Sequence, residues 1–228
     1  MPLIFISLND AFTEKIRLHG LEAYTMRIQD FQDFQDFQPR PQRKTFYVSP
    51  ANSLCFMDGG MDHALSRIVF PGIESRVKDA VRKLGITTKF GRPYLPIGSS
   101  IIVQSHGDEN THRFLVVTPT MLLPQDVSQT RNAYFATMAV LYNVLVMHEE
   151  SLDQVDILLT AFCCGYGKMD VETSVQQILD GIRDFPSYTP TKVPNHRAVV
   201  LEPNLIDQPK YYQNTEWFDI EPGEIKTV

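Results

Sequence analysis

The sequence predicts an α/β protein with three layers, in which helices cover both faces of a central, mixed and mostly parallel sheet. Short apolar runs that suit buried strands alternate along the chain with helical patterns that are apolar on one side. Two of these strands lead into glycine-containing loops, and each loop opens into a helix. Ligands of such sheets bind in the crevice at the carboxyl ends of the strands. The two loops are therefore the candidate ligand-binding segments.

Composition narrows the classes of protein to which the chain can belong. Its 228 residues are 43% hydrophobic, which is enough for a proper core. The net charge of −6 and the absence of a long Lys/Arg cluster argue against a protein that reads the phosphate backbone of nucleic acid. A small anion held by backbone amides is compatible with this charge.

Cysteine usage and the apolar runs predict a reducing, cytoplasmic location. The three cysteines, of which Cys163 and Cys164 are adjacent, form neither a disulfide framework nor a zinc spacing. No apolar run reaches the length that spans a membrane, and the N-terminus lacks the pattern of a signal peptide. We therefore expect no membrane partner.

The beginning of the chain predicts a strand, a helix and a second strand. Residues 3–8 are continuously apolar, and Asp10 is a candidate cap for a helix over residues 11–19 that Gly20 would end. Residues 21–28 alternate between apolar and polar side chains, which predicts a strand.

The next segment, residues 29–38, repeats Gln-Asp-Phe three times. The repeats contain the pairs Asp30-Phe31, Asp33-Phe34 and Asp36-Phe37. One interpretation is an extended surface loop whose phenylalanines partly cover the core. The other is that one Asp-Phe pair contacts a purine.

The rest of the chain continues the alternation of strands and helices. We expect strands at residues 45–48, 101–103, 114–118 and 155–162, and helices at 71–84 with Pro71 in the first turn, at 130–147 with Ser128 as a cap, and at 170–183. The connection with His106, Asp108, Glu109 and His112 is typical of a hairpin tip, so no metal site is predicted. Residues 186–228 are rich in prolines and tyrosines, which predicts an extension that packs on the domain of residues 1–185 or is loosely ordered.

The first candidate loop, residues 49–62, has two interpretations. Asp62 would cap a helix in an ordinary turn. Alternatively the loop wraps a ligand, because the amide of Asn52 both donates and accepts, and Gly59 and Gly60 have no Cβ atoms to keep a phosphate or a ribose away.

The second candidate loop, residues 163–169, carries Gly165 and Gly167 between a strand and a helix. Unpaired N–H groups and the positive end of a helix dipole would favour a phosphate there. Lys168 either adds positive charge or faces solvent. The glycine spacing matches neither Gly-x-Gly-x-x-Gly nor a Walker loop, which argues against a dehydrogenase and a P-loop NTPase.

Together the two loops resemble those of macro domains, the ADP-ribose-binding α/β/α modules. Ser49-Pro50-Ala51-Asn52 corresponds to the family's Asn-Ala-Ala-Asn motif, and Met57-Asp58-Gly59-Gly60 corresponds to its glycine run. Asn52 and Asp62 keep the family's separation of ten positions. The pattern is similar to a Ser-Pro-Ala-Asn-Ser/Met-Asp-Gly-Gly subgroup. Residues 162–169 match the second family loop, and the resemblance covers residues 1–185.

The resemblance implies a set of ADP-ribose contacts. Asn52 would contact the distal ribose, and Asp30 would accept a hydrogen bond from the adenine amine beside a stacking aromatic, with Asp33 or Asp36 as alternatives. The implied ligand-binding residues are Asp30, Phe31, Ala51, Asn52, Gly59, Gly60, Met61, Cys164, Gly165, Tyr166, Gly167 and Lys168.

The resemblance also implies a reaction, for which Asn52 and Asp62 are the candidate catalytic residues. Asp62 would orient or activate a water at the distal anomeric carbon of a mono-ADP-ribosyl ester or of ADP-ribose 1-phosphate, without a cofactor. Two sequence departures bear on this: Asp58 replaces a loop glycine and Ser49 replaces the first Asn. The alternatives are a module that reads ADP-ribosylated partners without turnover, and an interaction protein with a disabled pocket. Nucleic acid is expected only as an ADP-ribosylated substrate.

Overall fold

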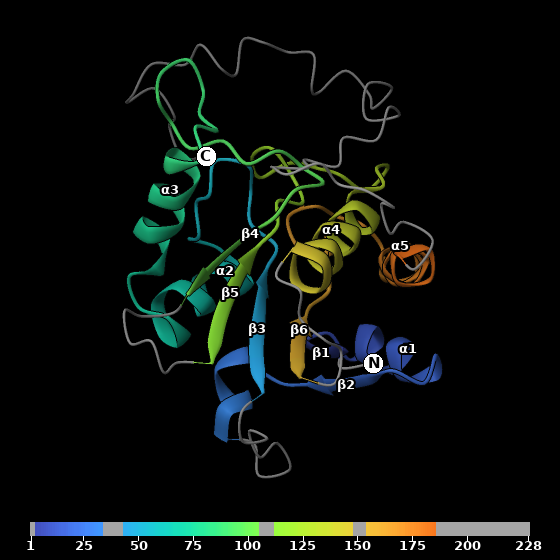
Figure 1. Cartoon of the computed structure of the whole chain (residues 1–228). Helices are drawn as coiled ribbons and strands as arrows, with labels where there is room; N and C mark the ends of the chain where they lie inside the picture. The colour runs from blue at the N-terminus through green and yellow to red at the C-terminus, as the bar shows by residue number, and fades with distance from the viewer. Residues whose placement is uncertain (1–2, 34–42, 105–111, 148–153, 186–228) are drawn as a thin grey trace.

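A six-stranded sheet forms the centre of the molecule in the computed structural model, which describes residues 3–33, 43–104, 112–147 and 154–185 (Figure 1). The strand order is β2-β1-β6-β3-β5-β4, and every neighbouring pair is parallel except β4 and β5. The predicted fold class is therefore confirmed. The strands are β1 Leu3–Ser7, β2 Glu22–Thr25, β3 Lys44–Ser49, β4 Ile101–Gln104, β5 Arg113–Val117 and β6 Val155–Leu159.

Helices cover the sheet on both faces and make the three layers visible in Figure 1. The helices α1, α4 and α5 lie on one face, and α2 and α3 lie on the other. Each face has its own hydrophobic core, because the side chains of a strand point alternately to its two sides. The helices are α1 Asp10–Leu18, α2 Gly60–Ala64, α3 Ile73–Lys83, α4 Asn132–Leu141 and α5 Val171–Asp184.

The parallel strands β1, β6 and β3 bring three chain segments to one edge of the sheet. Phe5 of β1 pairs with Leu159 of β6, and Tyr47 of β3 pairs with Leu158. These strands are buried along their whole length except for Lys44 at the start of β3. Because parallel strands end at the same edge, the loops that follow β1, β6 and β3 lie next to one another.

Four predicted helix starts are wrong by one or two residues. One is that of α5, which begins at Val171 after its cap Asp170 instead of at residue 170. The cap of α1 is Asn9, whose Oδ1 accepts a hydrogen bond from the Phe12 N–H at 3.1 Å, so that Asp10 is the first helical residue. Helix α3 begins at Ile73, after Gly72 with φ 80°, so Pro71 precedes the helix. Helix α4 begins at Asn132 rather than after Ser128, and its N-cap residue makes no side-chain capping bond.

Two predicted elements have a different local geometry. The helix expected at 130–147 is an α-helix only to Leu141 and continues as a π-helix, Tyr142–Met147. The strand expected at 21–28 is shorter because a 3₁₀ helix, Ile28–Asp33, begins at its end and takes in the first Asp-Phe pair. This pair is therefore helical rather than extended. Asp33 of the second pair ends this 3₁₀ helix. Phe34, the pair Asp36-Phe37, residues 106–109 and residues 186–228 lie outside the described residues.

Two kinds of feature are missing from the described residues, a membrane-spanning helix and a metal-binding cluster. No helix among them is long and apolar enough to cross a membrane. Within the same ranges, no group of three or more His, Cys, Asp or Glu side chains could hold a metal ion.

Candidate functional site

The loops that follow β3 and β6 form the walls of one cleft with a volume of about 820 Å³ at the carboxyl edge of the sheet. This volume falls within the range of about 300–1,000 Å³ that is usual for small-molecule sites. Most of the residues implied by the resemblance line it. They are Asn52, Gly59, Gly60, Met61, Asp62, Cys164, Gly165, Tyr166 and Gly167.

The two loops touch each other across the cleft. The side chain of Tyr166, which is 71% exposed, lies against Gly59. A Cβ atom on Gly59 would be 3.3 Å from Cε2 of the Tyr166 ring, so a larger residue there would push the ring away. Gly59 thus lets the aromatic ring approach the opposite loop.

Backbone packing gives the loop after β6 its shape. A Cβ atom on Gly167 would lie 2.5 Å from the Cys163 carbonyl oxygen and 2.7 Å from Cγ2 of Val127, so only glycine fits. The Met169 N–H donates to the Cys163 carbonyl at 3.0 Å, and the Lys168 N–H donates to the Gly165 carbonyl at 3.0 Å. These bonds close a tight loop around Gly167.

This loop leaves backbone donors for a ligand. Within the described part of the chain, the N–H groups of Cys164, Gly165, Tyr166 and Gly167 donate to no protein acceptor. The following helix α5 is capped by Asp170, whose Oδ1 accepts from the Thr173 N–H at 2.9 Å. An anion in the cleft would therefore meet the loop amides, because the carboxylate of Asp170 already occupies the helix end.

The loop after β3 is shaped by the side chain of Asn52, which is 7% exposed. Its Oδ1 accepts from the Leu54 N–H at 3.1 Å and from the Phe56 N–H at 3.3 Å. Its Nδ2 donates to the Phe56 carbonyl at 3.2 Å. Asn52 thus holds its own loop, and one of its two amide N–H donors is left for a ligand.

Asp62 lies inside the first turn of α2, so the expectation that it caps this helix is wrong. The N-cap is Gly59, which makes no side-chain capping bond. Ser49 at the end of β3 donates from Oγ to Oδ1 of Asp62 at 2.6 Å. This bond joins Ser49, which replaces the first Asn of the family motif, to the carboxyl group of the candidate catalytic residue Asp62.

The pKa of Asp62 is raised from 3.8 to about 7. Burial is the main cause, the hydrogen bond from Ser49 opposes it, and the negative charges of Asp58 and Glu74 add to it. Near neutral pH, both the protonated and the ionised form of Asp62 are therefore present. A pKa near the working pH suits a general base, which takes a proton and later returns it.

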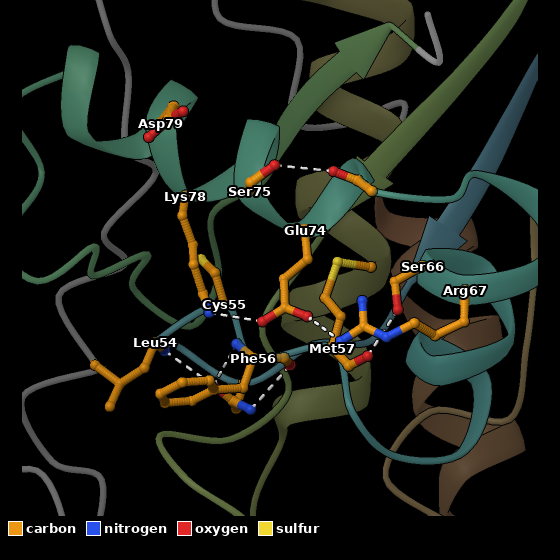
Figure 2. Close-up of polar contacts among 12 residues, drawn as sticks. Leu54, Cys55, Phe56, Met57, Ser66, Arg67, Glu74, Ser75, Lys78 and Asp79 are labelled. Carbon is orange, nitrogen blue, oxygen red and sulfur yellow. Dashed lines mark hydrogen bonds and ion pairs between the residues drawn. The ribbon is translucent and has the colours of Figure 1, made fainter. Parts of the chain in front are cut away.

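A network of charges from α3 and from the π-helix Leu65–Val69 lies next to the cleft loop (Figure 2). Glu74 accepts from Lys78 Nζ at 2.6 Å and from an Arg67 guanidinium nitrogen at 2.9 Å. Lys78 Nζ also lies 4.3 Å from the centroid of the Phe56 ring. Because Phe56 lines the cleft, this network connects α3 to the ligand wall.

The implied adenine contacts lie beside the cleft and not in its wall. Asp30 is bound to Arg27, with 2.7 Å between Oδ2 and Nε, and Arg27 is the residue that lines the cleft. Phe31 is fully buried in the core, where its ring centroid is 6.0 Å from that of Tyr24.

Two further implied residues also lie outside the wall. Ala51 is fully buried. Lys168 is exposed and faces Asp126, with 3.8 Å between Nζ and Oδ2.

The sequence-based reasoning missed several lining residues from other segments. Leu8 follows β1, Met26, Arg27 and Gln29 follow β2, and Ile68 lies in the π-helix Leu65–Val69 that continues α2. Leu8, Met26 and Arg27 lie at the ends of the predicted strands 3–8 and 21–28, and Gln29 directly follows the second of them. These positions do not say that the segments meet, and Ile68 has no comparable signal.

No family model matches the sequence, and a search of curated proteins finds no match either. Among solved structures, the chain is similar to the macrodomain of Mycobacterium tuberculosis DarG, with 16% identity, a TM-score of 0.46, and coverage of 64% of this chain and 86% of that one. It is also similar to a mutant Oceanobacillus iheyensis macrodomain with ADPR, with 18% identity, a TM-score of 0.49, and coverage of 64% and 73%.

A third similar structure is Thermosipho africanus DarTG in complex with ADP-ribose, with 15% identity and a TM-score of 0.45. The match covers 63% of this chain and 36% of that one. The likeness to macro domains that the two loops predicted is thus met again among solved structures. The matches do not distinguish a subgroup.

Proposed function

We propose that this chain is a macro domain that binds ADP-ribose in the cleft between the loops after β3 and β6. The observation that carries the proposal is the pairing of two unlike walls over one cleft. One wall has four backbone N–H groups without a protein acceptor in the described residues, and the other has the carboxyl of Asp62. A ligand that joins a diphosphate to a ribose meets both.

The diphosphate would bind the amides from Cys164 to Gly167. Backbone N–H groups in a glycine loop suit phosphate oxygens because they point at one place and carry no side chains that block the approach. Gly59 and Gly60 on the facing loop leave the same space open.

The adenine would pack at the end of the cleft formed by the segments after β1 and β2. Leu8 and Met26 give these segments an apolar surface, to which Ile68 of the π-helix Leu65–Val69 adds. Gln29 supplies a group that both donates and accepts. Asp30 remains our candidate for the contact with the adenine amine. It would reach the base after its ion pair with Arg27 opens.

The distal ribose would lie at Asn52 and Asp62. In a hydrolytic reaction the Asp62 carboxylate takes a proton from a water, and the water oxygen bonds to the distal anomeric carbon. The bond from that carbon to the attached group breaks, and the leaving group takes the proton. An ester or a 1-phosphate is the linkage that the resemblance implies.

Titration calorimetry with ADP-ribose tests the binding proposal, with AMP as the control ligand. We expect ADP-ribose to bind at least about tenfold more tightly than AMP, because only ADP-ribose reaches both walls. Absence of heat with millimolar ADP-ribose would contradict the proposal and favour an interaction protein with a closed pocket.

A module that reads ADP-ribose without turnover is the second candidate. The observation that favours it is that Asn52 uses most of its hydrogen-bonding capacity on its own loop. Release of ADP-ribose from mono-ADP-ribosylated protein, followed by chromatography, distinguishes the two. Binding without any release identifies a reader.

A further inference from the structure

The charges that line the cleft are unevenly distributed. Among the described lining residues, Arg27 is the one arginine and there is no lysine. Asp30 binds Arg27 and offsets its charge. The titratable lining residues are Arg27, Asp58, Asp62, His63, Cys163, Cys164 and Tyr166.

Two acidic side chains of the loop after β3 line the cleft. Asp58 is exposed and lines the cleft directly before Gly59, and Asp62 lines it from the first turn of α2. The charge of Asp58 disfavours ionisation of Asp62. A group attached to the distal ribose would therefore lie beside these two acidic side chains, of which Asp58 is the exposed one.

We propose that Asp58 makes this cleft selective for ADP-ribose joined to a guanidinium, as on an arginine side chain, over ADP-ribose that carries a phosphate on its distal ribose. The inference rests on the proposed function, because it assumes that the distal ribose lies at Asp62. A guanidinium offers planar N–H donors and a permanent positive charge, and carboxylates are its preferred partners. A phosphate dianion would meet the same carboxylates as like charges.

The size of the effect follows from the exposure of Asp58. A like-charge contact at a solvent-exposed site changes an affinity by roughly tenfold at low salt. Added salt reduces the difference, because exposed charges are screened over about 10 Å at 0.1 M ionic strength.

Calorimetric competition with three ligands tests the inference on the full chain. The ligands are ADP-ribose, ADP-ribose 1-phosphate and ADP-ribosyl-agmatine, whose guanidinium stands for that of arginine. The proteins are wild type, Asp58→Asn and the charge-matched control Asp79→Asn, since Asp79 on α3 pairs with Arg82 and does not line the cleft. Each affinity is divided by that of the same protein for ADP-ribose, which removes any general effect on the cleft.

We expect wild type to bind the agmatine conjugate at least about tenfold more tightly than the 1-phosphate, and Asp58→Asn to lose most of this preference while Asp79→Asn keeps it. Equal binding of the two conjugates by wild type would overturn the inference and leave ADP-ribose binding intact. A preference that Asp58→Asn retains would overturn the role of Asp58. Failure of wild type to bind ADP-ribose would overturn the proposed function together with the inference.

Discussion

The loops after β3 and β6 occupy equivalent places at the ends of neighbouring parallel strands, yet they are built in different ways. Backbone hydrogen bonds and the close packing of Gly167 shape the loop after β6. Side chains shape the loop after β3, through the bonds of Asn52, the contact of Ser49 with Asp62 and the charges around Glu74.

Under the proposed function, this difference would separate two tasks within one cleft. A wall made of backbone amides binds phosphate without adding any charge of its own. A wall made of side chains can hold a reactive carboxyl and discriminate between attached groups. Substitutions should therefore affect binding most in the loop after β6, and turnover or selectivity most in the loop after β3.

The largest effect is expected from Asp62→Asn on turnover. If the side-chain wall performs the reaction, hydrolysis should fall by about 10² to 10⁴-fold, which is the usual contribution of a general base, while the ADP-ribose affinity changes by only a few fold. Single-turnover release of ADP-ribose measures the rate and calorimetry measures the affinity. Asp79→Asn serves as the control, and an unchanged rate in Asp62→Asn would remove this residue from the mechanism.

Gly167→Ala should have the next largest effect and should act on binding. The added methyl would lie 2.5 Å from the Cys163 carbonyl oxygen, so the loop must shift. We expect the free energy of unfolding to fall by about 1–3 kcal/mol and the ADP-ribose affinity to fall at least about tenfold. Urea denaturation and calorimetry measure the two quantities.

Gly165→Ala is the matched control for stability, because a Cβ atom there meets nothing within 4 Å and its φ is not positive. Equal losses of stability in the two variants would show that the packing around Gly167 does not hold this loop. An unchanged ADP-ribose affinity in Gly167→Ala would break the assignment of binding to the backbone wall.

These local differences mark the limit of what the sequence could predict. Buried strands, the alternation with helices and both glycine loops are encoded in short-range patterns, so the sheet and the two main walls were predictable. The hydrogen bond from Ser49 to Asp62 and the ion pair of Arg27 with Asp30 depend on how segments meet in space. The sequence also left open whether Phe31 covers the core or stacks on a base, and the structure buries its ring in the core.

The predicted helix boundaries were wrong for a related reason. Asn9 and Asp10 are both good capping residues, and only the local backbone decides which one precedes the first turn. The π-helical continuation of α4 has no marker in the sequence, because its apolar residues keep helical spacing.

The pH dependence of stability should reveal the cost of the half-buried Asp62 carboxyl in the side-chain wall. Asp62 has a pKa of about 7 in the folded protein and 3.8 as its ordinary value. Between these pH values the unfolded chain loses a proton that the folded protein keeps, so stability falls as pH rises through this window. Asn does not titrate, and Asp62→Asn should therefore be more stable than wild type above pH 7, by about 1–3 kcal/mol after allowance for partial exposure.

Urea denaturation at pH 5 and at pH 8 measures this difference. The gain of Asp62→Asn over wild type should be larger at pH 8 than at pH 5, and Asp79→Asn should show no such trend. A constant difference between Asp62→Asn and wild type at both pH values would mean that the carboxyl ionises in the folded protein as it does in the unfolded chain.

Glu74→Gln should have the smallest effect, because it weakens only the support behind the side-chain wall. The change removes the charge that Lys78 and Arg67 share, and partly exposed ion pairs contribute about 0.5–1 kcal/mol. Lys78 would hold the ring of Phe56 less firmly, so the ADP-ribose affinity should fall about two- to threefold, as measured by calorimetry beside Asp79→Asn. A loss as large as that of Gly167→Ala would mean that the two walls bind the ligand equally, and that the division of binding and discrimination between them does not hold.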